Sequence, residues 1–190
     1  MKLDRILPFT KRLLEKVVKT GDIAVDATVG NGHDILFLAE LVGKDGFVFG
    51  FDVQKEAILT SKERLIQHGM LERVSLIHEG HETLFDNIPA TYHGKVSGAI
   101  FNLGFLPGSD KSIVTKSETT IAAVEQLLEM MAPEGIIVIV IYPGHPDGAI
   151  ERDALLHYCQ QIDQKAADVL QYQFINQKNN PSFIVAIGKR

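Results

Sequence analysis

The stretch of sequence best suited to chemistry lies where the first predicted strand gives way to a helix. Residues 26–34 read Asp-Ala-Thr-Val-Gly-Asn-Gly-His-Asp. Glycine permits a sharp turn and a close approach of the backbone to a ligand. The helix that follows offers unpaired N–H groups and the positive end of its dipole. We therefore expect this segment to bind a cofactor through Asp26, Gly30, Asn31, Gly32 and Asp34.

Two further strand ends complete the expected cofactor site. Asp52 closes the second predicted strand, where its carboxylate can accept hydrogen bonds from ribose hydroxyls, and Gln54 lies just beyond it. The third strand ends in His-Glu-Gly-His-Glu at residues 78–82, and we expect Gly80 and His81 to meet an adenine ring there. The pattern indicates a ligand that carries an adenosine.

Other interpretations of these residues compete with that one. An NAD fingerprint would place a third glycine at position 35, where the chain has Ile35, so an oxidoreductase is disfavoured. The glycines could instead form a tight turn capped by Asn31, with no ligand. His78 and His81 lack the spacing of a zinc-protease pair and have no evident third ligand, so we expect no metal.

A polar side chain suited to catalysis closes the fourth predicted strand. Residues 101–108 read Phe-Asn-Leu-Gly-Phe-Leu-Pro-Gly, on the strand expected beside the first at the topological switch point of the sheet. If the substrate reacts through a nitrogen, as the family resemblance given below implies, its lone pair must face the incoming carbon and acceptors have to hold its protons. The side-chain oxygen of Asn102 suits that role, unless Asn102 only caps the strand end. Asp110 and His145 are candidate bases by position alone.

The elements that position these groups belong to an ordinary globular chain. It has 190 residues, 45% of them apolar, and a net charge of −5, which favours one domain over residues 1–190 with a helix at residues 1–20 packed on it. The single cysteine, Cys159, excludes an internal disulfide. The longest apolar run, Ile136 to Tyr142, is too short for a membrane span of about 20 residues, and no signal peptide is evident. We expect a cytoplasmic protein without a membrane partner.

The hydrophobic pattern alternates strands and helices along the chain. Apolar stripes predict helices, among them one whose stripe is Ile150, Ala154, Tyr158 and Ile162. Only a short segment joins the last two strands, so the seventh strand should run antiparallel to its neighbour. The expected fold class is α/β, a Rossmann-like, doubly wound, mostly parallel sheet with helices on both faces. Its strands are predicted at residues 23–28, 47–53, 74–78, 96–103, 136–142, 169–175 and 183–187.

This pattern resembles a known family of enzymes. A sheet closed by an antiparallel seventh strand resembles the class I S-adenosylmethionine-dependent methyltransferases, and residues 102–108 resemble the (Asp/Asn)-Pro-Pro-aromatic loop of those that methylate amino groups. With Asn31, Asp52, residues 142–146 and the Asn-Asn-Pro of residues 179–181, the whole chain looks like a small bacterial group of ribosomal RNA methylases. The chain departs from the expected pattern at residues 147–148, Asp-Gly, where many relatives should have a glycine pair.

The resemblance implies S-adenosylmethionine as cofactor. By similarity to one branch of the group, it also implies methylation of the amine of 5-aminomethyl-(2-thio)uridine at the wobble position of tRNA. Phe105, Tyr142 and His145 would then hold the base at the pocket rim, and Lys111 would meet phosphate. The six bases among residues 1–19 could also meet RNA. Because the chain is small, we expect it to bind an anticodon stem-loop as a homodimer.

Two alternatives to this function stay open at the level of sequence. One is a ribosomal RNA methyltransferase that uses the same cofactor. The other is a non-catalytic protein that binds S-adenosylmethionine, against which the intact Asp52 and Asn102 argue.

Overall fold

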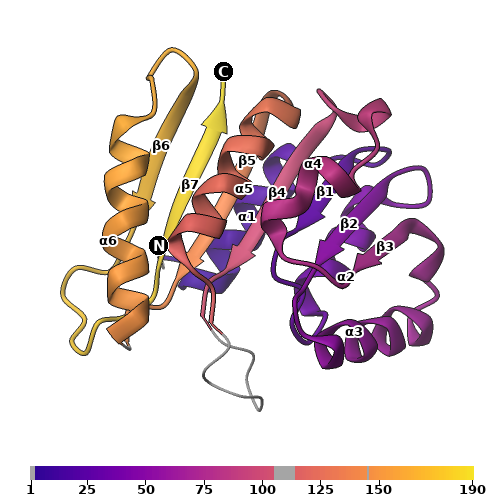
Figure 1. Cartoon of the computed structure of the whole chain (residues 1–190), viewed down its shortest axis with the longest axis horizontal. Coiled ribbons are helices and arrows are strands. Elements are labelled where there is room, and N and C mark those ends of the chain that lie inside the picture. The colour runs from indigo at the N-terminus through magenta and orange to yellow at the C-terminus, as the bar shows by residue number, and fades with distance from the viewer. Residues whose placement is uncertain (1–2, 105–113, 145) are drawn as a thin grey trace.

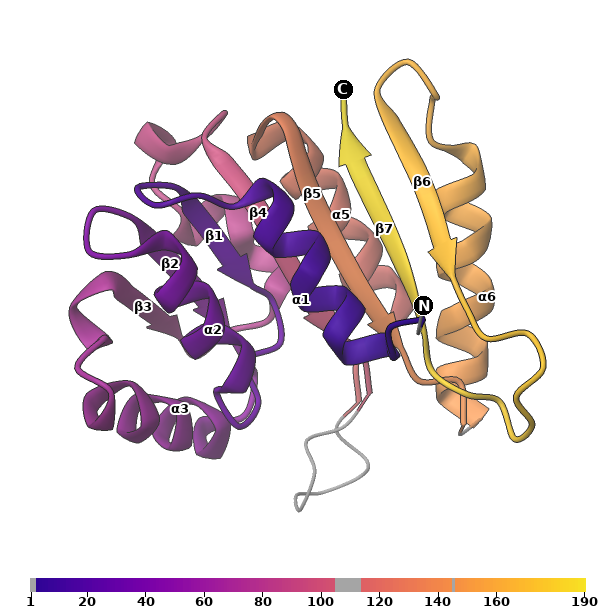
Figure 2. The same ribbon diagram turned by 180° about the vertical axis from the view of Figure 1, so that it is seen from behind.

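The chain folds as a central sheet between two layers of helices (Figures 1 and 2). The computed structural model describes residues 3–104, 114–144 and 146–190. The strands of the sheet lie in the order β3-β2-β1-β4-β5-β7-β6. Their bounds are β1 (Ile23–Asp26), β2 (Phe47–Phe51), β3 (Val74–Ile77), β4 (Val96–Asn102), β5 (Met131–Ile141), β6 (Ala167–Tyr172) and β7 (Phe183–Lys189).

The direction of the strands agrees with the expected fold. β7 pairs antiparallel with both β5 and β6, whereas the other pairings are parallel. The predicted antiparallel seventh strand is thereby confirmed. β1 pairs with β2 on one side and with β4 on the other. The carboxyl ends of these three strands therefore meet at the centre of one sheet edge, which is the switch point where such sheets bind ligands.

Helices cover both faces of the sheet. α1 (Ile6–Val17), α2 (His33–Val42) and α3 (Lys55–Gln67) lie on the face toward the viewer in Figure 2. The other face carries α4 (Leu84–Asn87), α5 (Ser117–Met130) and α6 (Pro146–Gln161), toward the viewer in Figure 1. Short 3-10 turns at Leu71–Arg73, His81–Thr83 and Ala90–Tyr92 complete the connections.

β5 shows why the sheet needs both helical layers. Its side chains from residue 135 to 141 are all buried, and successive ones point to opposite faces. Ile137, Ile139 and Ile141 belong to the core beneath α5 and α6. The residues between them, Ile136, Val138 and Val140, belong to the core beneath α1 and α2. A strand buried on both faces reads as one unbroken apolar run, as this one does.

The stripe predicted for α6 is confirmed at Tyr158 and Ile162, which pack against the core, but it is wrong at its first position. Ile150 is 67% exposed, whereas the buried face of the helix carries Glu151, Leu155 and Cys159. Glu151 is only 4% exposed because its carboxylate accepts hydrogen bonds from two threonine hydroxyls described below. Hydrophobic periodicity could not find this face, since a carboxylate occupies its first position. β6 also begins and ends earlier than predicted, at Ala167 and Tyr172.

In the part of the chain that the structure describes, no helix combines the length and apolar character needed to cross a membrane.

Candidate functional site

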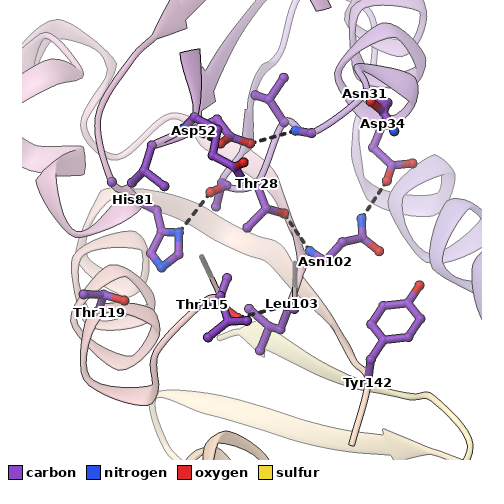
Figure 3. A pocket seen from close by; sticks show the side chains of 18 of the residues that line it. Thr28, Asn31, Asp34, Asp52, His81, Asn102, Leu103, Thr115, Thr119 and Tyr142 are labelled. Carbon is purple, nitrogen blue, oxygen red and sulfur yellow. Dashed lines mark hydrogen bonds between the residues drawn. The ribbon is translucent and has the colours of Figure 1, made fainter. Parts of the chain in front are cut away.

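A cavity of about 1120 Å³ opens at the carboxyl edge of the central strands (Figure 3). Its lining comes from α1, the β1–α2 loop, the ends of β2, β3 and β4, the start of α5 and Tyr142. Such a volume suits a nucleoside-sized ligand together with part of a second molecule. The expected cofactor residues that line it are Gly30, Asn31, Asp34, Asp52, Gln54, Gly80, His81 and Asn102.

The glycine loop between β1 and α2 is held open by its backbone conformation and by α3. Gly30 and Gly32 have φ values of 52° and 78°, in the left-handed region that side chains disfavour. A Cβ on Gly32 would lie 2.7 Å from the Ser61 hydroxyl oxygen, so α3 packs directly on this turn. The Ser61 hydroxyl donates to the Gly30 carbonyl, and Arg64 Nε donates to the Asn31 carbonyl.

Asp52 ties this loop to the end of β2. Its carboxylate accepts the N–H of Gly30 over 2.9 Å through Oδ2 and the N–H of Gln54 over 2.9 Å through Oδ1. A carboxylate offers about four acceptor positions, so these two bonds leave acceptor capacity on each oxygen. The carboxylate also lines the cavity, which makes it a suitable acceptor for two neighbouring hydroxyl groups.

Asn102 is fixed from two sides at the end of β4. Its backbone N–H donates to the Thr28 hydroxyl over 2.7 Å, and its side-chain Nδ2 donates to Asp34 Oδ2 over 2.7 Å. The amide oxygen, which must point away from Nδ2, accepts no hydrogen bond from the described residues. Burial raises the pKa of Asp34, while the positive charge of Lys11 and the Asn102 hydrogen bond oppose that rise.

Tyr142 and α1 close the cavity beside this pair. Figure 3 shows the Tyr142 ring next to Asn102, with its hydroxyl turned toward Asp34 and Asn102. Burial, and then the nearby Asp34 charge, raise the pKa of the Tyr142 phenol. From α1, Leu7, Pro8 and Lys11 line the same region. Sequence reasoning missed this wall, because nothing local in a basic helix indicates which strand end it will face.

The imidazole of His81 is part of the cavity wall and is not free to read an adenine ring. Nδ1 lies 3.0 Å from the Ala27 carbonyl oxygen, and Nε2 lies 3.5 Å from the Thr120 hydroxyl. Since a carbonyl can only accept, Nδ1 carries the proton. Burial lowers the pKa of His81, which keeps the ring neutral. The backbone of Gly80 and His81 remains at the cavity surface.

Two expected cofactor residues do not line the cavity. Asp26 is fully buried beneath the loop, where Oδ1 accepts the N–H of Thr28 over 3.1 Å and Oδ2 has no hydrogen-bond partner. Gly32 faces α3. Asp26 and Gly32 therefore support the glycine loop on its side away from the cavity. Four other predicted site residues, Phe105, Asp110, Lys111 and His145, lie outside the described residues.

A polar network behind the cavity joins α5 and α6 to the end of β4. Glu151 accepts hydrogen bonds from the hydroxyls of Thr115, over 2.7 Å, and Thr120, over 3.1 Å. Thr115 in turn accepts the N–H of Gly104 over 2.9 Å, and its own N–H donates to the Gly104 carbonyl. No local pattern in the sequence indicates this network, since its members are isolated polar residues. Over the described ranges, no group of three or more His, Cys, Asp or Glu side chains could hold a metal ion.

Comparison with known proteins adds a family to this geometry. The model of the family described as "Putative rRNA methylase" matches residues 48–188, well over half of the chain. The chain belongs to this rRNA methylase family.

Two solved structures of similar proteins share the whole fold. A crystal structure of an rRNA methylase of this kind from Clostridium thermocellum is 40% identical, with a TM-score of 0.96 and full coverage of both chains. A methyltransferase of Streptococcus mutans, solved in complex with SAH, is 36% identical with a TM-score of 0.90, again over both whole chains. The predicted class I S-adenosylmethionine-dependent methyltransferase fold is thereby confirmed.

A plant relative of the rRNA methylase family has a more specific name. The chloroplastic tRNA (mnm(5)s(2)U34)-methyltransferase of Arabidopsis thaliana is 33% identical over 178 residues, which cover 90% of this chain. The chain spans slightly less than two thirds of that relative, 64% of its length.

Proposed function

We propose that this protein is an S-adenosylmethionine-dependent RNA methyltransferase that methylates the amine of 5-aminomethyl-(2-thio)uridine at the wobble position of tRNA. The observation that carries the proposal is the Asn102 amide, held by Thr28 and Asp34 so that its oxygen is left to accept a hydrogen bond from a substrate N–H. The name of the plant relative supports tRNA as the substrate class.

The chemistry of the cavity fits S-adenosylmethionine. Asp52 retains acceptor capacity for the two ribose hydroxyls, and the strand end at Gly80 lies where the adenine would be. The open glycine loop at Gly30 and the first turn of α2 would hold the amino-acid part of the cofactor. When bound, the cofactor supplies a methyl carbon attached to a positively charged sulfur, which is a good leaving group.

The residues around Asn102 would prepare the substrate amine for attack. An amine that titrates like lysine, near 10.4, has to lose a proton before it can react, which costs up to about 5 kcal/mol at neutral pH. A partly dry pocket lowers that cost by disfavouring the ammonium form. The Asn102 oxygen would hold one remaining N–H, so that the lone pair points toward the methyl group. Orientation of this kind supplies a large part of the acceleration in bimolecular reactions.

The amine also needs a counter-charge and a group that takes its proton. Asp34 lies one hydrogen bond away from Asn102 and gives the pocket a negative charge that attracts a cationic amine. Asp110 and His145 stay candidates for the base that takes the proton. Tyr142, 39% exposed at the rim, would stack on the uracil ring.

We also infer that the enzyme binds the anticodon stem-loop as a homodimer, with Phe105, Lys111 and the basic α1 contributing to the RNA surface. The support is the size of the chain, which has 190 residues and carries a net charge of −5. Light scattering of the purified protein tests the oligomeric state. A monomer that still binds tRNA tightly would contradict it.

A ribosomal RNA substrate is the second candidate, favoured by the description of the family. Purified protein should therefore be incubated with S-adenosylmethionine and either tRNA or rRNA from a deletion strain, followed by mass spectrometry of nucleosides. We expect one added methyl group on 5-aminomethyl-2-thiouridine, in tRNA alone. A new methyl group in rRNA alone would make rRNA the substrate and would leave the proposed cofactor and methyl transfer unchanged. No product in either would favour a non-catalytic binding protein.

A further inference from the structure

The connection between β6 and β7, residues 173–182, lies at the same sheet edge as the cavity (Figures 1 and 2). β7 runs antiparallel to β5, and the register pairs Phe183 with Ile141. The residues just before Phe183 therefore lie beside those just after Ile141. Continued by one residue, this register sets Ser182 opposite Tyr142, which lines the cavity, and the Asn-Asn-Pro segment at residues 179–181 directly precedes Ser182.

The other end of this connection is anchored to α1. The Tyr172 ring stacks on Phe9, with ring centroids 4.1 Å apart, and its hydroxyl donates to the Asp4 carbonyl over 2.8 Å. Phe174 packs edge-on against Tyr172 at 5.7 Å. The connection is thus attached at one end to the helix that walls the cavity and at the other to the strand that leads to Tyr142.

Between these anchors the backbone adopts an unfavourable conformation. Asn179 and Asn180 have φ values of 65° and 48°, two consecutive non-glycine residues in the left-handed region. Both are exposed, and neither side chain forms a hydrogen bond to another described residue. Glycine would adopt this backbone with less strain. The turn therefore presents two amide side chains to solvent.

The chemistry of the exposed residues suits single-stranded RNA. Amide side chains can donate to and accept from base edges. Ile175 is 93% exposed and offers an apolar contact for a base face, and Lys178 offers a charge for phosphate. After Asp168 the sequence contains no acidic residue, although the whole chain has a net charge of −5.

We propose that residues 173–182 form a second RNA contact, in which Asn179 and Asn180 bind nucleotides that flank the target base. This inference rests on the proposed function, because it takes the substrate in the cavity to be an RNA nucleotide. It assigns recognition of the neighbouring nucleotides to an element outside the cofactor cavity.

The experiment replaces the amides while keeping the backbone. Asn179→Gly and Asn180→Gly, singly and together, remove the side chains and relieve the left-handed strain. Glu134→Gly is the matched control, since Glu134 is exposed, has a φ of 64° and lies at the amino end of β5, away from the cavity. Each variant is measured for thermal midpoint, affinity for SAH, and kcat and KM with an anticodon stem-loop RNA that carries the modified uridine.

We expect the thermal midpoint and the SAH affinity of each variant to match or exceed those of the wild type. KM for RNA should rise about tenfold in the double variant, as expected for a lost base contact, and should not change in Glu134→Gly. If the wild-type enzyme is active and the KM for RNA is unchanged in the double variant, this inference is overturned and the proposed function is not. If light scattering gives the double variant a smaller molar mass than the wild type, the turn is a contact between two copies of the chain. That result would also overturn this inference. A wild-type enzyme inactive on the RNA would overturn the proposed function first.

Discussion

Asn102 Nδ2 donates a 2.7 Å hydrogen bond to Asp34 Oδ2, joining the end of β4 to the first turn of α2. The two residues are 68 positions apart in the sequence. The bond engages the amide nitrogen of Asn102 and leaves its amide oxygen to accept a hydrogen bond. Asp34, expected from the sequence to bind cofactor, thereby becomes a positioning residue for the group proposed to hold the substrate.

Asn102→Asp should disable this arrangement in a pH-dependent way. The new carboxylate would lie against the Asp34 carboxylate, and two such groups in contact favour retaining a shared proton. We expect turnover to fall about 100-fold at pH 8 and to recover partly toward pH 6. Asn102→Ala serves as the comparison, with a similar loss at both pH values and SAH affinity near that of the wild type. Loss of SAH binding in Asn102→Ala would contradict the proposed role.

Asp52→Asn tests the hydrogen bonds by which Asp52 joins the glycine loop to the end of β2. Either orientation of the new amide places an NH₂ group against an N–H donor, at Gly30 or at Gln54. We expect SAH binding, measured by calorimetry, to weaken by about 1–3 kcal/mol. Glu56→Gln, exposed on the first turn of α3, is the control and should bind SAH normally. Equal affinity in both variants would exclude Asp52 from the cofactor site.

Asp26 should make the protein less stable as the pH rises. Burial, then repulsion from Asp34, raise the pKa of this carboxyl well above its ordinary value of 3.8, so the folded state binds its proton more tightly than the unfolded state. The stability from this group is therefore fully present below the unfolded pKa and is lost as the pH rises through the folded pKa.

Asp26→Asn removes that titration without changing the shape of the side chain. The thermal midpoint of the variant relative to the wild type should increase from pH 4 to pH 8. Asp45→Asn, on an exposed loop, should show no such trend. A constant difference across this range would mean that Asp26 does not titrate with folding.

Glu151→Ala should destabilise the fold behind the cavity. The change leaves the hydroxyls of Thr115 and Thr120 without their shared acceptor in a buried setting. We expect the free energy of unfolding, from urea titration, to fall by about 1–3 kcal/mol. Glu129→Ala on the exposed face of α5 should change it by less than about 0.5 kcal/mol. Similar values for the two variants would show that the network contributes little.

Cys159 should resist thiol reagents while the protein is folded. Burial raises the pKa of its thiol to about 11, and the side chain is 4% exposed. Because the thiolate is the reactive form, labelling at pH 8 should be slow in the native protein and rapid in urea. The chain has one cysteine, so the signal reports this site alone. Fast labelling of the native protein would indicate local opening of α6.

Much of the fold and part of the candidate site could be predicted from local sequence. The unbroken apolar run of β5 indicated a strand buried on both faces, and the short link before β7 indicated an antiparallel pairing. Polar residues at strand ends, such as Asp52 and Asn102, were found because parallel strands bring their carboxyl ends to one edge. These features follow from patterns of a few residues.

The failures have a common physical cause. The apolar stripe of α6 was misplaced because Glu151 is buried by its threonine partners on other segments. His81 lines the cavity as expected, but its ring nitrogens lie against Ala27 and Thr120. In each case the environment of a polar group depends on residues distant in the sequence, which no local periodicity reports.

The sequence by itself determined the order of strands and helices, the glycine loop and the polar strand ends, because each is encoded by spacing along a short segment. Only the tertiary structure decided how those groups are engaged. It placed α1 against the cavity, oriented Asn102 through Asp34, and set the β6–β7 connection at the same sheet edge as the cavity. Hydrogen-bond direction and strand register are relations between distant segments, so they exist only once the chain has folded.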